Sequence, residues 1–367
     1  HAAAFARTAY ETAWLKLNHA VEFGCGLLNN QPMGFYHPSV LVEDLKRHGV
    51  TVLPVEINRS DVRCLPEALT ESTRLAPNVP NGAAAENGQS PAGPSLLSGS
   101  LPQPADLRPG YGNFEIPTTQ VVKTHGMRIG LNYVRDLGED GRKAIVAERE
   151  RGGPYTSFDT FLYRLLGGPI GPRAVRNLVM VGAFDGLGRP RRDLLWGWQE
   201  RWHGRGLRKG IHPQSELKLQ ATSPPLPELD DFDVNQLEYR ISDLSTGHHL
   251  IHFCRERLDQ LGALPSDKLP SIPTGRTVRV AGLVITRQAP STAKKIRFFT
   301  LEDEFGQVNV TIKPDVYDRY RQVANRQPIL VIDGMMQRQD GVWSVLASHI
   351  QALEGVPRPH QRSHDYR

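Results

Sequence analysis

Five short segments near the C-terminal end constrain the fold of this chain more than any other feature of its sequence. In each of them apolar and polar residues alternate, which is the period of a strand with one buried face. The segments are residues 277–286, 295–301, 307–313, 329–338 and 342–352. Turn sequences separate neighbouring strands, such as DEFG at 303–306 and QDG at 339–341. Between the third and fourth strands, Val316, Tyr320 and Val323 repeat at helical spacing and predict one helix.

The element order strand-strand-strand-helix-strand-strand predicts an OB fold over residues 272–353. This small five-stranded barrel often binds oligonucleotides through an open face and its loops. Because side chains alternate across a strand, each segment has one inward and one outward set. The predicted inward set is Val278, Val280, Ile296, Phe298, Val308, Val310 and Ile312. The predicted outward set is Arg279, Arg297, Phe299, Asn309, Thr311 and Lys313.

Cations and an aromatic ring on one open face suit single-stranded nucleic acid, because the charges attract phosphates and a base stacks on the ring. The predicted DNA-binding residues of this face are Arg279, Arg297, Phe299 and Lys313. Further candidates in or beside the loops are Arg287, Lys294, Lys295 and Arg338. A barrel whose charges are merely solvated is the alternative that the sequence leaves open.

The stretch AFDGLGRPRR, at 183–192, joins two predicted helices, 174–180 and 191–202. Gly186 and Gly188 let the backbone approach a ligand closely, and the free amides at the start of the next helix suit a phosphate. The cations predicted to assist are Arg189, Arg191 and Arg192. The alternative is a helix-capping glycine followed by a solvated helix start.

A similar plan occurs upstream in RIGLNYVRDLGEDGRKAIVAERE, where a helix is expected to end near Arg135 and another to cover 139–150. The candidate phosphate contacts of this copy are Gly138, Arg142 and Lys143. Asp136 stands where a glycine is expected, and its carboxylate would repel a phosphate. The two copies together predict a tandem helix-hairpin-helix region over residues 113–205.

The remaining segments complete a multidomain α+β architecture. Residues 1–65 are predicted to be mostly helical, with Tyr10, Trp14, Leu17 and Val21 forming one buried stripe. Residues 66–112 are rich in Pro, Gly, Ser, Ala and Asn and are predicted to be a disordered linker or insertion. Residues 206–271 are predicted to connect the domains through a helix around 250–261, and 354–367 form a tail.

Composition narrows the class of protein. The formal net charge is +5, and residues 189–209 carry seven basic and two acidic side chains, which favours a polyanionic partner. Cys25, Cys64 and Cys254 have no paired spacing, so we expect a reducing, cytoplasmic setting without disulfides or structural zinc. The cluster His248, His249 and His252 lacks a matching carboxylate or cysteine and is not predicted to bind a metal. No apolar run is long enough to span a membrane.

Several stretches resemble the C-terminal third of bacterial C-family DNA polymerase alpha subunits. Residues 1–23 and 27–50 are similar to the end of the fingers domain of that family. RIGLNYVRDLGEDGRKAIVAER and AVRNLVMVGAFDGLG resemble its tandem helix-hairpin-helix region, and the sequence from VRVAGLVIT to DVYDRYR resembles its OB domain. QPMGFY, STAKKIRFFTLEDE and the terminal SHDYR are closer to the error-prone, damage-inducible branch. The resemblance covers nearly the whole chain except 66–112 and parts of 205–240.

The resemblance implies a template-directed nucleotidyltransferase that uses two Mg²⁺ ions held by palm carboxylates. Those carboxylates would lie upstream of His1, so no catalytic or metal-binding residue is assigned here and the fragment alone is predicted to be inactive. His1 is the candidate contact for nucleotide phosphates. The implied partners are primer-template DNA, single-stranded template, deoxynucleoside triphosphates, a sliding clamp and an inactive polymerase-like mutagenesis accessory protein. No clamp-binding motif is evident.

A standalone DNA-binding adaptor, built from the same hairpins and barrel and without enzymatic activity, is the competing hypothesis. The missing initiator Met and the start of the chain inside a predicted helix favour the polymerase. Genomic sequence upstream of His1 would discriminate between them, since a palm with an Asp-x-Asp pair in the same reading frame is expected only for a polymerase.

Overall fold

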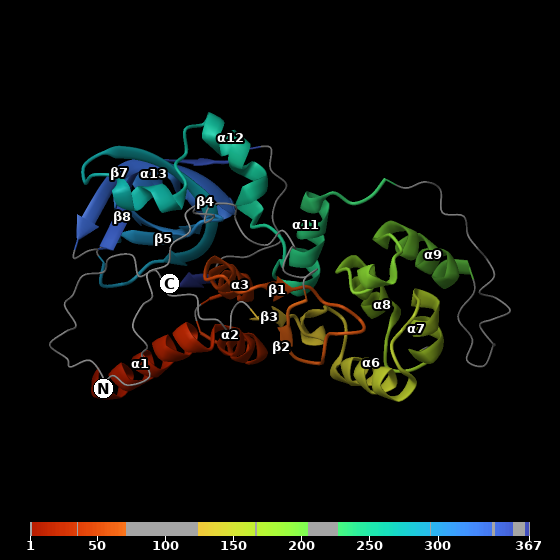
Figure 1. Ribbon diagram of the computed structural model, residues 1–367. Coiled ribbons are helices and arrows are strands. Elements are labelled where there is room, and N and C mark those ends of the chain that lie inside the picture. The colour runs from red at the N-terminus through yellow and green to blue at the C-terminus, as the bar shows by residue number, and fades with distance from the viewer. Residues whose placement is uncertain are drawn as a thin grey trace, which may run out of the picture.

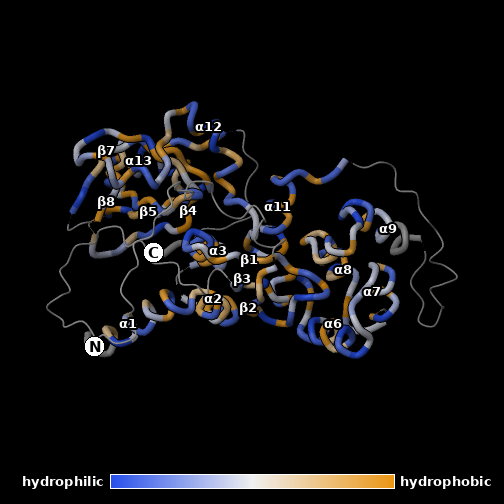
Figure 2. The backbone as a smooth tube through the Cα atoms, viewed as in Figure 1, coloured by the Kyte–Doolittle hydropathy of each residue, from blue (hydrophilic) through white to orange (hydrophobic). Residues whose placement is uncertain are grey.

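The computed structural model describes residues 2–34, 36–70, 124–165, 167–204, 227–293, 295–339, 342–354 and 364–366. The described part is elongated, with a barrel at one end, helical hairpins at the other, and α3, α11 and a small sheet between them (Figure 1). Apolar segments concentrate inside the barrel and around the small sheet (Figure 2). His1, Lys294 and the predicted linker from residue 71 onward lie outside the described residues.

Two helices and a small sheet form the middle of the molecule, and a further helix, α1, extends from it toward the N-terminus (Figure 1). The helices are α1 (Ala2–Asn18), α2 (Ala20–Asn29) and α3 (Pro38–Arg47). The strands are β1 (Val52–Leu53), β2 (Leu65–Ala68) and β3 (His125–Arg128), in the order β1-β3-β2. The predicted linker therefore begins too early, because residues 66–68 pair with β3 as part of β2.

The predicted buried stripe of the first helix is wrong along α1. Tyr10, Trp14 and Leu17 are 62%, 47% and 36% exposed, whereas Val21 is completely buried. Val21 belongs to α2, which begins after a break at His19 and packs on α3 and β3. Helical periodicity reports that an apolar face exists, but it does not tell whether the described chain covers that face.

Four helices form the hairpin region. They are α6 (Glu139–Gly152), α7 (Phe158–Leu165), α8 (Pro172–Met180) and α9 (Arg191–Gly204). Their core contains edge-to-face aromatic pairs, with Phe184 4.9 Å from both Phe158 and Phe161 between ring centroids. The helix expected to end near Arg135 is instead strand β3 followed by the short 3-10 helix η2 (Leu131–Tyr133). Gly130 between them abuts Arg63 and leaves no room for a Cβ.

A helical segment leads from the hairpins to the barrel. It contains α11 (Asp231–Ser242), η4 (Leu250–Cys254), α12 (Arg255–Gln260) and η5 (Ser266–Ser271). The predicted helix at 250–261 is present, although its first turn is 3-10. Leu250, Ile251 and Leu258 pack against the outer side of the barrel together with Ala281 and Val331.

The C-terminal barrel has the predicted element order. Its elements are β4 (Thr277–Gln288), β5 (Arg297–Glu302), β6 (Gln307–Ile312), α13 (Pro314–Arg326), β7 (Ile329–Gln339), β8 (Val342–Ala352) and β9 (His364–Tyr366). The sheet order is β5-β6-β8-β7-β4-β9, and an additional β4–β5 pairing closes the five-stranded barrel. β6 and β8 are parallel, whereas the other pairs of the closed barrel are antiparallel. The OB fold is confirmed.

Candidate nucleic-acid interface

The second hairpin, between α8 and α9, has the turn that its glycines predict. Gly188 adopts a left-handed backbone (φ 74°), and its amide donates to the Asp185 carbonyl at 3.1 Å. Gly186 and Gly188 are both exposed, and no atom lies within 4 Å of a Cβ placed on Gly188. The exposed Arg189 follows directly. This corner therefore presents open backbone at Gly188 beside one exposed cation, whereas the Glu56 carboxylate lies 3.3 Å from the position a Cβ on Gly186 would take.

Arg191 holds this corner together from within. Its guanidinium donates to both carboxylate oxygens of Asp185, at 2.6–3.0 Å, and to the Met180 carbonyl at 3.0 Å. Arg192 lies 3.6 Å from Asp233 at the start of α11. The expectation that three arginines project together toward a phosphate is therefore corrected, because two of them have internal acidic partners and Arg189 alone extends freely among the described contacts.

The first hairpin shows why Asp136 replaces a glycine. Asp136 adopts φ 64°, a conformation that glycine takes most readily and that Asp tolerates better than most residues. Its carboxylate accepts a hydrogen bond at 3.1 Å from Asn177 of α8, which also donates to the Arg135 carbonyl at 2.7 Å. Asn177 therefore connects the two hairpins directly.

The start of α6 carries the remaining candidates of the first hairpin. Gly138 is its N-cap, is exposed and has no neighbour within 4 Å of the position that a Cβ would take. Arg142 donates back to the Leu137 carbonyl at 2.8 Å, and Lys143 pairs with Glu139 at 2.6 Å on the surface. This pairing holds the pKa of Glu139 below its usual value, so a carboxylate stands where a phosphate would approach. The first hairpin is the less favourable anion site of the two.

In the barrel, the predicted facing of β4 and β6 is confirmed and that of β5 is wrong. Val278, Val280, Val308, Val310 and Ile312 are inside, as expected. Phe299 and Leu301, however, are 2% and 0% exposed and belong to the same core, whereas Phe298 is 37% exposed. Strand β5 begins only at Arg297, so Ile296 does not take part in the pleat and Leu301 fixes which side faces inward.

This shift also moves Arg297 off the open face. Its guanidinium carbon lies 4.8 Å from the ring centroid of Tyr317 on α13. Arg287 is likewise turned toward α13, where it donates to the Ala324 and Gln327 carbonyls at 2.9 and 2.8 Å. Arg279 is paired with Asp333 at 2.5 and 2.9 Å and donates to the Leu261 carbonyl. These three predicted DNA ligands instead hold the barrel to the elements around it.

The open face that remains runs along β5 and β6. Its exposed aromatic residue is Phe298, paired across the strands with Thr311, and Thr300 is paired with the exposed Asn309. Lys295 and Lys313 are exposed at one end of this face, and Arg338 is exposed at the β7–β8 hairpin. Of the predicted cations of this face, Lys313 alone remains exposed on it, and Phe298 takes the position predicted for Phe299; binding of nucleic acid here stays a prediction.

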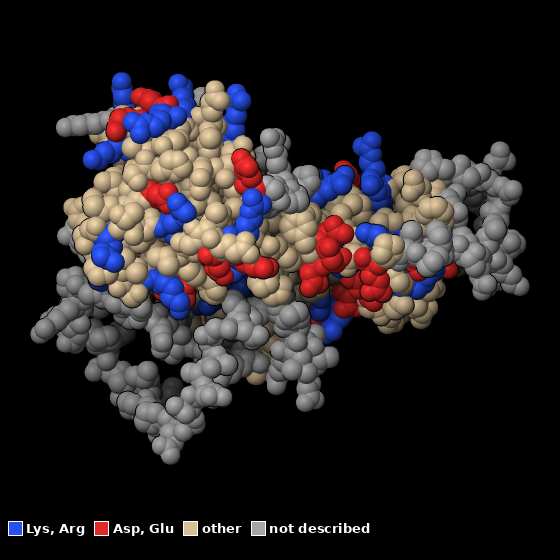
Figure 3. All heavy atoms as spheres, turned by 90° about the horizontal axis from the view of Figure 1, so that it is seen from above, with Lys and Arg blue, Asp and Glu red and all other residues tan. Residues whose placement is uncertain are grey.

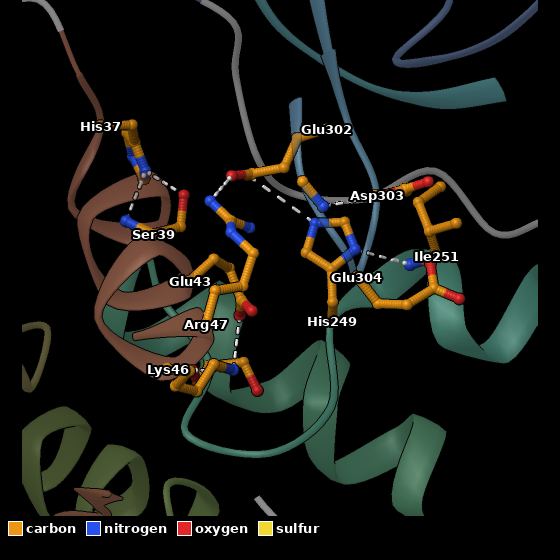
Figure 4. A network of polar contacts seen from close by, with 12 residues as sticks. His37, Ser39, Glu43, Lys46, Arg47, His249, Ile251, Glu302, Asp303 and Glu304 are labelled. Carbon is orange, nitrogen blue, oxygen red and sulfur yellow. Dashed lines mark hydrogen bonds and ion pairs between the residues drawn. The ribbon is translucent and has the colours of Figure 1, made fainter. Parts of the chain in front are cut away.

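A buried polar seam joins the barrel to the helical part, and no pattern in the sequence indicates it (Figure 4). Arg47 of α3 donates to Glu302 of β5 at 2.9 Å, with side-chain exposures of 13% and 1%. His249 accepts from the Ile251 amide through Nδ1 at 3.2 Å, and its Nε2 lies 3.8 Å from Glu302. A neutral His249 ring therefore carries its proton on Nε2, which faces Glu302.

A second ion pair reinforces this seam. Arg255 of α12 binds both carboxylate oxygens of Glu304, at 2.7 and 2.8 Å. Burial favours a higher pKa for Glu304, but the hydrogen bonds and charge of Arg255 hold its pKa below the usual value. Burial raises the pKa of the adjacent Asp303, against the hydrogen bonds from Ser266. Nearby, Lys46 pairs with Glu43 at 2.6 Å and donates to the Gly247 carbonyl.

Thiol and histidine chemistry takes no part in this surface. The three cysteines are buried and free, and burial raises the pKa of Cys25 to about 12 and that of Cys64 to about 11. The rings of His248 and His252 stack on each other, with their centroids 4.1 Å apart. Among the described residues, no three His, Cys, Asp or Glu side chains are grouped to hold a metal ion. Within the same residues, no helix has the length and apolar character needed to cross a bilayer.

Comparisons with known proteins agree with this domain order. A family model described as a helix-hairpin-helix motif matches residues 49–194, and one described as an OB-fold nucleic acid binding domain matches residues 278–353. Relatives named error-prone DNA polymerase match nearly the whole chain. Those of Methylococcus capsulatus, Burkholderia pseudomallei and Nocardia farcinica are 30%, 33% and 31% identical over 96%, 96% and 100% of this chain. This chain is homologous to part of the error-prone DNA polymerases.

The chain spans only 30%, 28% and 27% of the length of these three relatives. Part of the chain aligns with solved structures, such as the asparaginyl-tRNA synthetase of Pyrococcus horikoshii, at 18% identity over 26% of this chain and 23% of that one, with a TM-score of 0.22. So low a score carries no argument. The comparisons therefore show that this chain corresponds to part of the error-prone DNA polymerases and contains a helix-hairpin-helix module and an OB-fold module, whereas the role of this portion is a separate question.

Proposed function

We propose that this chain is the C-terminal DNA-gripping portion of an error-prone DNA polymerase that acts in damage-induced mutagenesis and translesion synthesis. One observation carries the proposal. A helix-hairpin-helix module and an OB barrel occur in one chain that is homologous to polymerases over nearly its whole length, and the buried ion pairs Arg47–Glu302 and Arg255–Glu304 fasten the barrel to α3 and α12. Such a unit grips DNA at two places.

The two modules take different forms of DNA in this proposal. The hairpins contact the backbone of the primer-template duplex through the N-terminal amides of α6 after Gly138 and through Arg189 beside the exposed turn of Gly186 and Gly188, without reading sequence. The barrel holds the single-stranded template on the β5–β6 face, where a base stacks on Phe298. Acidic side chains gather near the middle of the face shown in Figure 3, so the proposed DNA path runs over other faces.

The chemistry of the whole enzyme remains proposed as well. Template-directed transfer from deoxynucleoside triphosphates would need Mg²⁺ held by carboxylates. In this proposal both the metal and the catalytic residues lie outside this chain. A sliding clamp, a polymerase-like accessory protein and a cytoplasmic location likewise belong to the proposal.

The salt dependence of duplex binding tests the proposal. For the 367-residue chain, the logarithm of the affinity for primer-template DNA should fall linearly with the logarithm of salt concentration. Arg189→Ala should reduce the slope by about 0.9, the value for one lost phosphate contact. The matched control is Arg7→Ala, which removes an exposed arginine on α1 that is paired with Glu11. A chain that binds no primer-template DNA at low salt would contradict the proposed function.

A further inference from the structure

His249 lies inside the seam, and each of its two ring nitrogens faces a different group (Figure 4). Nδ1 accepts from the Ile251 amide at 3.2 Å and thereby caps η4. Nε2 lies 3.8 Å from Oε2 of Glu302, and among the described residues neither of these two atoms has a hydrogen-bond partner. The side chains of His249 and Glu302 are both 1% exposed. The cap on η4 is therefore formed, whereas the contact with Glu302 is about 1 Å longer than a hydrogen bond.

Three carboxylates act on the His249 ring, and each of them has a cation of its own. The ion pairs are Arg47–Glu302, Lys46–Glu43 and Arg255–Glu304, at 2.9, 2.6 and 2.7 Å. They come from α3, from α12 and from the C-terminal end of β5 with the turn that follows it. The ring therefore lies among charges that already balance in pairs, so a proton on His249 adds one net positive charge to the seam.

The other titratable groups of the elements packed around His249 leave this balance unchanged. They are Glu238 and Tyr239 of α11, Asp303 after β5, and the stacked pair His248 and His252. Glu238 accepts hydrogen bonds from the Ser245 and Thr246 hydroxyls, and Asp303 accepts from Ser266. Burial raises the pKa of Tyr239 well above its usual value and lowers that of His248, so both are uncharged at neutral pH.

Protonation of His249 exchanges one of its two contacts for the other. A neutral imidazole has one donor and one acceptor nitrogen, whereas an imidazolium has two donors. Because the Ile251 amide is itself a donor, a proton on Nδ1 ends the cap on η4. The positive charge also strengthens the attraction between Nε2–H and the Glu302 carboxylate. The charged ring therefore cannot keep both partners.

The surroundings of the ring bring this exchange close to neutral pH. Burial lowers the pKa of His249, whereas the contact with Glu302 and the charges of Glu43, Glu302 and Glu304 raise it, and the folded pKa lies above the ordinary value of 6.5. The stability that the charged ring contributes is therefore complete below pH 6.5 and is lost as pH rises through the folded pKa.

We propose that His249 is a pH-dependent switch in the seam between the helices and the barrel. When Nδ1 takes a proton from solvent, the ring releases the Ile251 amide and forms an ion pair with Glu302 beside Arg47. Ile251 is completely buried and packs against β4 and β7, so release of its amide loosens η4 where it contacts the barrel. The proposal goes beyond the proposed function and does not depend on it, because it involves no DNA.

The first test is a nuclear magnetic resonance titration of the 367-residue chain with ¹⁵N-labelled histidine, from about pH 5.5 to about pH 8.5. The nitrogen shifts report which ring nitrogen carries a proton, and the His249 signal is the one that disappears in His249→Asn. His249 should be the Nε2–H tautomer at the upper end and carry two protons at the lower end. Glu302→Gln should move this titration to lower pH, because it removes the charge that favours the imidazolium.

Hydrogen exchange at the Ile251 amide gives the readout that a purely structural histidine would not move. Protection of this amide should fall about fivefold as His249 becomes charged, the factor that corresponds to one ordinary hydrogen bond. The internal reference is the amide of Ala263, which donates to the Leu258 carbonyl at 2.9 Å in the same apolar cluster.

Two histidine variants separate the switch from general effects of pH. His249→Asn should keep Ile251 protected at every pH, because Asn caps a helix without titrating. His125→Asn replaces an exposed histidine of β3, outside the seam, and should leave the titration and the exchange unchanged.

Three results would each overturn the proposal. One is a His249 ring that stays neutral down to about pH 5.5. The second is a ring that becomes charged while Ile251 keeps its protection relative to Ala263. The third is a pH-dependent protection of Ile251 that persists in His249→Asn. Since none of these measurements uses DNA, loss of DNA binding would contradict the proposed function without touching this switch.

Discussion

The Arg47–Glu302 pair gives the sharpest energetic test of the seam between the helices and the barrel. Both side chains are mostly removed from water, at 13% and 1% exposure, and their atoms are 2.9 Å apart. Removing one partner of a buried pair typically costs about 3–5 kcal/mol, because a charge remains buried without compensation. Here one guanidinium nitrogen of Arg47 and one oxygen of Glu302 already lack hydrogen-bond partners. We therefore expect the lower end of that range.

The experiment is a double-mutant cycle on urea unfolding. Arg47→Met should lower the free energy of unfolding by about 3 kcal/mol, and Glu302→Gln by a similar amount. The double variant should lose less than the sum, because neither charge is then left alone in the seam. Trp343 is the tryptophan of the barrel, so its fluorescence reports whether the barrel unfolds with the helices.

The surface pair Arg7–Glu11 supplies the matched control. Its side chains are 84% and 55% exposed, and an i,i+4 pair of this kind is worth about 0.3–0.5 kcal/mol. Arg7→Met should therefore change stability very little. If Arg47→Met were no more destabilising than Arg7→Met, or if the two seam variants were strictly additive, the seam would not hold the barrel in place and the reasoning would be refuted.

Three further predictions concern single sites. Phe299→Ala should lower the free energy of unfolding in urea by about 3–5 kcal/mol, because its ring is in the barrel core. Phe298→Ala should leave that free energy nearly unchanged and weaken oligonucleotide binding by about 1–3 kcal/mol. The reverse pattern would contradict the facing of β5. Because the folded pKa of Glu304 lies below its ordinary value of 4.5, the stability it contributes is complete above that value and should be lost as pH falls through the folded pKa. Glu304→Gln should flatten this loss in urea titrations at several pH values, and an equally steep loss would exclude Glu304 as its source. Since burial raises the pKa of Cys25 to about 12, its thiol should react with an aromatic disulfide reagent at about pH 8 only as fast as the chain unfolds, and rapid labelling of the folded chain would contradict its burial.

The barrel was predictable because its strands carry a strong period and clear turns. The predicted strand at 342–352 has the same bounds as β8, and the helix predicted around Val316 is α13. The facing of β5 was not predictable in the same way. Two adjacent phenylalanines, Phe298 and Phe299, fit either phase of an alternating pattern, and the choice depends on where the strand begins.

The second hairpin was predictable at the level of backbone, and Gly188 and Asp136 both occupy left-handed positions, whereas the first helix expected for the first hairpin is β3 followed by η2. The partners of the arginine side chains were not predictable. Arg191 forms an ion pair with Asp185, and Arg279 forms one with Asp333. A sequence pattern does not say which cations the fold will pair with acidic side chains. Of the sixteen predicted DNA contacts, the fold leaves the glycines Gly138, Gly186 and Gly188 exposed, and among the described residues it leaves the side chains of Arg189, Lys295, Lys313 and Arg338 exposed and unengaged.

The seam of Figure 4 was hidden from the sequence for a related reason. Arg47 and Glu302 are 255 residues apart, and each lies in an element whose local pattern is complete without the other. Burial of charge between two modules is decided only when they dock. Tertiary pairing of this kind leaves no period, spacing or composition for a single sequence to display.

Asn177 gives the hairpin region a mechanical property. One side-chain amide bonds both to the Arg135 carbonyl and to the Asp136 carboxylate, so the turn of one hairpin is fastened to the helix that precedes the other. The first corner cannot tilt relative to α8 without breaking these bonds. If both corners contact a DNA backbone, the protein fixes the distance along the duplex between the two contacts. A distorted duplex must then match that distance or lose one of the two contacts.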